Sequence, residues 1–360
     1  MSTPTEGIAL SAQTPRMFEV SAINRTPTQA VALGRLESFD AFRPMAAFAT
    51  ILVHSSISPE SQRWTPLSRF SLPFFVLAAI YFLFRGERKH PEVSFGQQLR
   101  QRAWRLLLPF AAWNVIYALL RVAKHLVLVH EGPPKFDWNA IWVGSAHHLW
   151  FLPYLLVTTV WVLTVIRTMR RMPLLRIPAA ILLLALGAAM CFTPEPAICH
   201  LPTYNSYFLD RAFVMLPSIC WGTALGLLLM EDDGTFETDW RIGSFGLVLI
   251  LLGTIVVGAA VPHSGPYRMA RHFSGMGVLL VALMPVRGEI INRLAVLGRC
   301  SYGIFLSHVA FVEGIQAVAA RLGAKISWPL DLTVFMLSCI GATALTLLLR
   351  RSSKTRWLAG

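Results

Sequence analysis

An arginine and a histidine are the first residues in this chain whose types and spacing could do chemistry. Arg43 and His54 stand eleven residues apart in a largely apolar stretch. On a helix this spacing is close to three turns, so both side chains project from one face, about 16 Å apart along the axis. Histidine exchanges protons near neutral pH and arginine holds anions, so a functional site is one explanation. The other is an arginine at the membrane surface and a histidine satisfied by a neighbouring helix.

The same stretch has the features of a first membrane helix. Residues 41–58 are mostly apolar, and Pro44 would stand in the first turn, where a missing amide proton costs nothing. Asp40 then either caps the helix or orients Arg43. Ionisable side chains inside a membrane face protein or water rather than lipid, so we expect the face with Arg43 and His54 to point into a bundle.

The composition is typical of a polytopic membrane protein. The chain has 360 residues, of which 55% are hydrophobic and 14% charged, and its mean hydropathy is +0.55. A net charge of +13 raises the question of nucleic acid, but the basic residues form short clusters between apolar spans rather than one soluble face. We therefore interpret them as a topology signal, with the lipid bilayer and not nucleic acid as the partner.

Ten apolar spans predict an all-α fold, a helical bundle that crosses the membrane about ten times. They cover residues 41–58, 68–84, 105–122, 147–166, 177–192, 211–230, 242–261, 272–285, 298–319 and 331–349. Residues 1–34 lack a long apolar run and are rich in Ser, Thr, Pro and Ala, which predicts a disordered cytoplasmic tail rather than a signal peptide. Residues 351–360 are expected to form a short basic cytoplasmic tail.

The distribution of Lys and Arg predicts the orientation of these spans. With both termini in the cytoplasm, the inner segments hold 21 basic residues and the outer segments hold 10. A bias of this sign in short loops indicates cytoplasmic termini. His54 would then lie about 20 Å along its helix from the inner end, in the outer half of the membrane.

Signals for other kinds of site are weak. The sequence has no glycine-rich phosphate loop and no metal-ligand cluster of recognisable spacing, so we expect no metal. His147 and His148 are adjacent and cannot offer two ligands from one helical face. Cys191 and Cys199 flank a predicted outer loop and could pair in an oxidising compartment, but the five cysteines form no framework.

Five short motifs follow one another along the chain at predicted helix starts. They are Arg35-Leu-Glu-Ser-Phe-Asp40-Ala-Phe-Arg43, Leu72-Pro-Phe-Phe-Val-Leu, Arg100-Gln-Arg102-Ala-Trp-Arg105-Leu-Leu-Leu-Pro109, His148-Leu-Trp150-Phe-Leu and Leu297-Gly-Arg299-Cys-Ser301-Tyr302-Gly-Ile-Phe-Leu-Ser-His308. In this order they resemble the motifs of the membrane-bound acyltransferase-3 family. The resemblance covers one transmembrane domain, residues 35–350. Pro44 departs from it, because the family commonly has glycine there.

This resemblance implies transfer of an acyl group, usually acetyl, from a cytoplasmic acyl-CoA such as acetyl-CoA to a hydroxyl group, often on a glycan or glycolipid. An alcohol is a poor nucleophile, and His54 as general base could take its proton while it attacks the thioester carbonyl. A covalent acyl-histidine relay is the alternative. Arg43 would hold a donor phosphate or polarise the thioester oxygen.

Arg102 and Arg105 are the predicted donor-binding residues. They are i, i+3 neighbours at the inner mouth of the third span, and arginine forks match the geometry of the phosphates in coenzyme A. Anchoring by the positive-inside rule explains the same two arginines. Because the other motifs accompany them, donor binding is the interpretation that we carry forward.

Four other motif residues each have a binding and a structural interpretation. Ser301 and Tyr302 could bind the donor, although Ser301 is equally placed to cap a helix. Trp150 could line the acyl or the acceptor cavity, and His148 could form a hydrogen bond in the outer cavity. A solvated histidine and a tryptophan at the membrane interface are the structural alternatives. The candidates for substrate binding are Asp40, His148, Trp150 and Glu313.

Charged residues at predicted outer helix ends complete the set of candidates. Glu313, about 22 Å along the ninth span, could orient a histidine, pair with a basic residue or reach outer water. Asp210 and Arg211, at the outer start of the sixth span, could contact an acceptor or pair with each other.

Two function classes fit these features. A membrane O-acetyltransferase acting on a cell-surface or exported glycan, in a bacterial cytoplasmic (inner) membrane, explains both the arginine–histidine face and the inner arginine cluster. A transporter or flippase of a glycan precursor or small molecule also needs many helices and an ionisable cavity. Transporters more typically show inverted-repeat hydropathy, and this sequence shows none.

Overall fold

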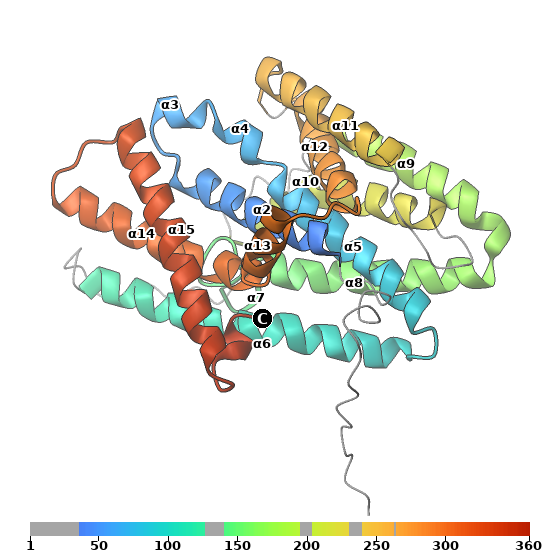
Figure 1. The fold of residues 1–360 in the computed structure, drawn as a ribbon, viewed down its shortest axis with the longest axis horizontal. Coiled ribbons are helices and arrows are strands. Elements are labelled where there is room, and N and C mark those ends of the chain that lie inside the picture. The colour runs from blue at the N-terminus through green and yellow to red at the C-terminus, as the bar shows by residue number, and fades with distance from the viewer. Residues whose placement is uncertain (1–35, 127–139, 195–203, 230–239, 263) are drawn as a thin grey trace, which may run out of the picture. The chain divides into compact units, whose positions relative to one another are not determined.

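The computed structural model describes residues 36–126, 140–194, 204–229, 240–262 and 264–360, and within them every regular element is a helix (Figure 1). The long helices are α2 (Glu37–Ser55), α5 (Ser71–Lys89), α6 (Phe95–Lys124), α8 (Phe151–Arg171), α9 (Arg176–Phe192), α10 (Tyr204–Leu228), α11 (Trp240–Ala259), α12 (Gly265–Ala282), α14 (Ser301–Arg321) and α15 (Trp328–Arg351). The short ones are α3 (Pro59–Gln62), α4 (Thr65–Ser68), α7 (Ala140–Val143), η3 (Pro173–Leu175), α13 (Glu289–Gly298) and η5 (Arg356–Leu358).

Each long helix overlaps one of the ten predicted spans, so the prediction of a polytopic helical membrane bundle is confirmed. In the described part of the chain, eight helices are long and apolar enough to cross a membrane. α2 and α12 are not among them, because charged residues lower their hydropathy: Asp40 and Arg43 in α2, Arg268 and Arg271 in α12. The number of crossings and the side of the termini stay predictions.

α2 is an interior helix of the bundle. It packs against α13, α14, α15, α5 and α12, which surround it in Figure 1. Small or fully buried side chains mediate this packing, among them Ala46, Ala47 and Ile51 at 0% exposure. Small residues let neighbouring membrane helices approach closely. The helix that carries Arg43 and His54 is therefore held by protein on several sides, as their aligned face requires.

A buried aspartate fixes the end of α2 nearest His54. Oδ2 of Asp331, in the first turn of α15, accepts hydrogen bonds from the backbone amides of Ile57 at 3.0 Å and Ser58 at 2.8 Å. It also accepts one from the Ser58 hydroxyl at 2.7 Å. Buried amide groups need such partners once the chain leaves a helix. Asp331 thus ties the chain just after α2 to α15.

The start of α2 differs from the prediction. The helix begins at Glu37, its N-cap is Leu36, and no side chain caps it, so Asp40 lies in the first turn and is not the cap. Carboxylates there interact favourably with the helix dipole. Pro44 therefore lies inside the helix rather than in its first turn, and the Asp40 carbonyl loses its helical partner. A Cβ at Gly298 would lie 1.8 Å from that oxygen, so only glycine lets α13 approach it.

The last residues of the chain pack against the bundle. The Trp113 indole in α6 donates a hydrogen bond of 3.0 Å to the carbonyl of Leu358 in η5. Ala359 is fully buried, and it lies close to Gly303 of α14. The segment 351–360, expected as a basic tail, therefore contacts α6 and α14.

Two predictions fall outside the described residues. The tail 1–34 is one, and the pairing of Cys199 with Cys191 is the other. Cys191 itself is buried in α9, where its thiol donates to the carbonyl of Gly187 at 3.4 Å.

Candidate active site

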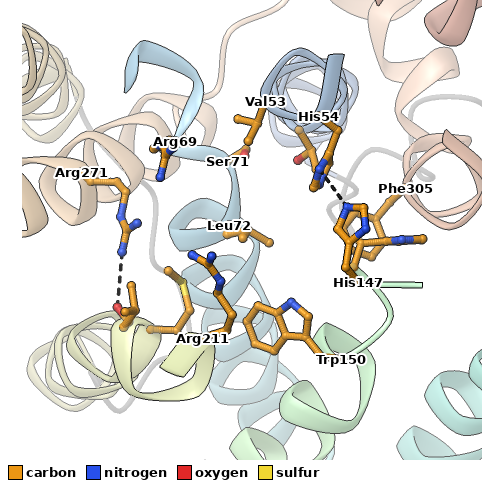
Figure 2. Close-up of a pocket in the computed structure, with 14 residues that line it drawn as sticks. Val53, His54, Arg69, Ser71, Leu72, His147, Trp150, Arg211, Arg271 and Phe305 are labelled. Atoms are coloured by element: carbon orange, nitrogen blue, oxygen red, sulfur yellow. Dashed lines mark hydrogen bonds between the residues drawn. The ribbon is translucent and has the colours of Figure 1, made fainter. Parts of the chain in front are cut away.

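A cavity of about 300 Å³ lies where α2, α5, α10, α12 and α14 meet the segment before α8. Figure 2 shows that its polar lining is divided, with histidines on one side and arginines on the other. The ionisable residues that line it are His54, His147, His148, Arg69, Arg211 and Arg271. The structure thus places His54, His148 and Trp150, three of the predicted site residues, around one space.

Two histidines are joined by a hydrogen bond at the edge of this cavity. His54 Nδ1 lies 3.0 Å from His147 Nε2 (Figure 2). The second nitrogen of His54, Nε2, has no hydrogen-bond partner in the part of the chain that the structure describes. When Nδ1 carries the proton and donates to His147, the lone pair on Nε2 is left to accept a proton from another molecule.

Two further histidines pack behind this pair. The ring of His308, in α14, lies 5.3 Å from the ring of His54 and 4.9 Å from that of His148. His148 is 3% exposed, and its Nε2 lies 3.2 Å from the carbonyl of Leu306. Despite this crowding, no group of three or more His, Cys, Asp or Glu among the described residues is arranged to hold a metal ion.

The burial of His148 and Trp150 excludes the structural alternative for each residue. Both side chains are 3% exposed, so His148 is not a solvated histidine and Trp150 is not a tryptophan on the outer surface of the bundle. The Trp150 ring packs edge-on against Phe151 and Tyr154, with ring centroids at 5.8 Å and 5.4 Å. This packing fixes the indole against the cavity.

The opposite side of the cavity is basic. Arg69 follows α4, Arg211 lies in α10 and Arg271 in α12. Arg271 is 7% exposed, and its Nη2 donates a long hydrogen bond of 3.5 Å to the carbonyl of Val214. Arg211 pairs with Asp210, with Nε 3.5 Å from Oδ2, so these two neighbours do interact with each other.

Arg43 lies outside this lining. Its Nη1 donates to Oδ1 of Asp40 at 3.2 Å, so Asp40 orients Arg43 as one of the two interpretations expected. The Arg43 side chain is half-buried, at 30% exposure. The helix face shared with His54 is therefore real, but the two side chains do not line the same cavity.

A second group of candidates meets where α6 and α14 come together. The Tyr302 hydroxyl donates to the carbonyl of Arg105 at 3.3 Å. Arg102 is half-buried and Arg105 exposed. Ser301 is buried and is the first residue of α14, with Cys300 at the N-cap, so Ser301 does not cap the helix. The predicted donor residues Arg105 and Tyr302 are thus brought into contact.

Glu313 forms an ion pair with a lysine. Its Oε2 lies 3.8 Å from Nζ of Lys124, and both side chains are nearly half exposed. This arrangement agrees with the interpretation in which Glu313 pairs with a basic residue.

Sequence reasoning missed His147, Arg69 and Arg271 as site residues. His147 was considered only as a metal ligand, although a histidine next to a motif histidine at a helix start was a usable signal. Arg69 and Arg271 were counted only as outer loop charges. Their position at the ends of apolar spans was the available signal, but their convergence depends on helix packing.

Comparison with known proteins adds one positive result. A family model described as an acyltransferase domain matches residues 36–351. The matched range includes every residue that lines the cavity. No curated protein matches the chain.

Proposed function

The chain belongs to the acyltransferase-3 family, and from this premise we propose that it moves an acyl group, acetyl in the first instance, from acyl-CoA to a hydroxyl group of a cell-surface or exported glycan. The observation that carries the proposal is the hydrogen bond of 3.0 Å between His54 Nδ1 and His147 Nε2 at the cavity. A base held in place by a second polar group is the arrangement by which proteins activate weak nucleophiles.

In this proposal His54 acts as general base. Its Nε2 takes the hydroxyl proton while the hydroxyl oxygen bonds to the thioester carbonyl carbon. Collapse of the tetrahedral intermediate breaks the carbon–sulfur bond, and the leaving coenzyme A thiolate receives the proton from His54. The products are an ester and free coenzyme A, and His54 returns to its neutral state.

His147 positions this base. By accepting the Nδ1 proton of His54 it selects the tautomer whose Nε2 is unprotonated, and it keeps a partner for the imidazolium that forms during the reaction. Neutral histidine is a weaker partner than a carboxylate, so we expect His147 to contribute mainly orientation.

We place the donor at the junction of α6 and α14. Arg102 and Arg105 offer guanidinium groups for the phosphates of coenzyme A, and the bond between Tyr302 and the Arg105 carbonyl holds the two helices together there. Arg43, oriented by Asp40, would contact the donor rather than the acceptor. Following the positive-inside rule, we propose that this junction faces the cytoplasm and that the cavity lies in the outer half of the membrane, which we take to be a bacterial inner membrane.

The test is incubation of the purified full-length chain with acetyl-CoA labelled in the acetyl group, with and without a panel of sugars. Acyl transfer predicts acceptor-dependent release of free coenzyme A and label in the sugar. Uptake of a sugar into vesicles without thioester cleavage would support the transporter instead. Absence of cleavage with every acceptor, in protein that binds coenzyme A, would contradict the proposal.

A further inference from the structure

Three arginines from separate elements surround one end of the cavity. Figure 2 shows the side chains of Arg69, Arg211 and Arg271 on the side opposite His54 and His147, with Leu72 between the two groups. All three arginines line the cavity, and the described residues that line it include no Asp or Glu. The arginine end therefore presents positive charge to whatever occupies the space.

Two of these charges lack a carboxylate partner. Within the described ranges neither Arg69 nor Arg271 forms an ion pair, and the Nε of each has no hydrogen-bond partner. Arg271 is more than nine-tenths buried, so water does not readily replace the missing partner. Arg69 and Arg211 both act electrostatically on Arg271, and like charges repel.

Such an arrangement of guanidinium groups is unfavourable without a counter-ion. A buried charge without a partner carries a desolvation penalty, and repulsion between guanidinium groups adds to it. Three arginines held around one cavity indicate that an anion completes them. Carboxylate and phosphate are the groups whose geometry matches the arginine fork.

We propose that the acceptor carries an anionic group, carboxylate or phosphate, which binds Arg69, Arg211 and Arg271 while a hydroxyl of the same molecule faces His54. This inference rests on the proposed acyl transfer. A cavity of about 300 Å³ limits the distance between the two groups, so the anion and the reacting hydroxyl belong to the same sugar unit or to adjacent ones. Neutral sugars would leave Arg69 and Arg271 without an anionic partner and would bind weakly.

Binding of three probes to the purified full-length chain tests the proposal: glucuronate, glucose 6-phosphate and glucose. The wild type is expected to bind one or both anions and to bind glucose at least tenfold more weakly. Arg271→Gln and Arg69→Gln should each weaken anion binding at least tenfold, and Arg271→Lys should retain part of it. Arg63→Gln is the matched control, because Arg63 is an exposed arginine in the same α3–α4 segment that does not line the cavity.

Several results would overturn the proposal. They are equal binding of glucose and the anions, no binding of either anion by the wild type, and unchanged anion binding in both Gln variants. If Arg271→Gln does not fold, the half-buried Arg69 provides the decisive variant. Competition between coenzyme A and glucuronate, with coenzyme A binding weakened in the same variants, would assign these arginines to the donor and also overturn it.

The anion site and the proposed function can fail separately. His54→Gln should abolish acetyl transfer, while glucuronate binding by this variant should still depend on Arg69 and Arg271, because these arginines lie on the other side of the cavity. Anion binding that depends on Arg69 and Arg271, without transfer to any acceptor, would support the anion site and contradict the proposed acyl transfer. Transfer to neutral sugars alone would support acyl transfer and contradict the anion site.

Discussion

Two arginine clusters in this protein are built in opposite ways. Arg167 and Arg170, in α8, both bind Glu87 of α5, with the nitrogen to carboxylate oxygen distances at 2.7 Å and 2.9 Å. Glu87 is 1% exposed and each of its carboxylate oxygens has its own arginine. At the cavity, Arg69 and Arg271 have no such carboxylate among the described residues.

The arginines that bind Glu87 stabilise the fold, whereas we propose that the arginines at the cavity bind a ligand. The Glu87 cluster joins two helices and adds backbone contacts, since Arg170 Nη2 donates to the Glu87 carbonyl at 2.6 Å and Arg167 Nη2 to that of Val93 at 2.8 Å. The charges of both arginines are therefore paired with a carboxylate inside the protein. Arg69 and Arg271, by contrast, have no carboxylate partner among the described residues, and they line the same cavity as His54.

The largest expected effect is on the cavity side, from moving the histidine by one position. Val53 and His54 both line the cavity, so the double variant Val53→His, His54→Val keeps a histidine there but rotates it by about 100°. It should lose the contact with His147, and acetyl transfer should fall by about 10²–10⁴-fold. Transfer is measured with labelled acetyl-CoA. Activity close to wild type would show that the position of the base on the helix does not matter.

The opposite pattern is expected from Glu87→Gln. Removing the carboxylate leaves two arginines facing each other, and we expect the free energy of unfolding to fall by about 3 kcal/mol, at the low end for buried pairs because the arginines are near 30% exposed. Denaturant unfolding in detergent measures it. The variant should still bind glucuronate like the wild type.

The matched control for this variant is an exposed pair. Glu289 binds Arg293 at 2.9 Å on the surface of α13, and both side chains are over 70% exposed. Glu289→Gln should change the unfolding free energy by only about 0.3–0.5 kcal/mol. An equally small effect of Glu87→Gln would contradict the structural role of the Glu87 cluster. Loss of anion binding in folded Glu87→Gln protein would contradict the separate roles of the two clusters.

Arg102 and Arg105 form a third group of arginines. Neither has a carboxylate partner in the described structure, so they resemble the cavity arginines in keeping donors available. Arg102→Ala or Arg105→Ala should weaken coenzyme A binding by about 1.5–3 kcal/mol, and Lys should restore only part of it. Arg100→Ala, at an exposed site two residues before Arg102 in the same helix, is the control. Normal coenzyme A binding in both Ala variants would show that Arg102 and Arg105 serve only as a topology signal.

The smallest expected effect on binding or transfer is that of His147→Phe. It removes one hydrogen bond to His54 and keeps an aromatic ring of similar size at the cavity edge. One hydrogen bond of about 1 kcal/mol corresponds to roughly a five- to tenfold lower transfer rate. Donor binding and glucuronate binding should not change. A rate equal to that of the wild type would remove the positioning role of His147.

Local patterns predicted the helices and part of the site. Hydropathy placed each long helix, because a membrane segment must be long, apolar and internally hydrogen-bonded. The predicted start of α2 lies a few residues too far along the chain, because the prediction relied on the first apolar residues. The helix begins at Glu37, and the carboxylates of Glu37 and Asp40 in its first turn stabilise the helix N-terminus electrostatically. Hydropathy does not detect this effect.

What the sequence could not show is how separate helices converge. His147 comes next to His54 because α2 packs in the interior and the segment before α8 turns toward it, a tertiary arrangement without a local periodicity. The same holds for Arg69 and Arg271. Arg43 and His54 share a helix face, as predicted. Only His54 lines the cavity, because Arg43 lies elsewhere along the helix and pairs with Asp40.

The role of His54 as base is tested by comparing acetyl transfer by the wild type and by His54→Gln, with coenzyme A binding measured on the same preparations. An amide can hydrogen-bond to His147 but cannot take a proton near neutral pH. We expect unchanged coenzyme A binding and a transfer rate about 10²–10⁴-fold lower in the variant. Equal transfer rates in the two proteins would contradict this role, because His54 would then not be the base.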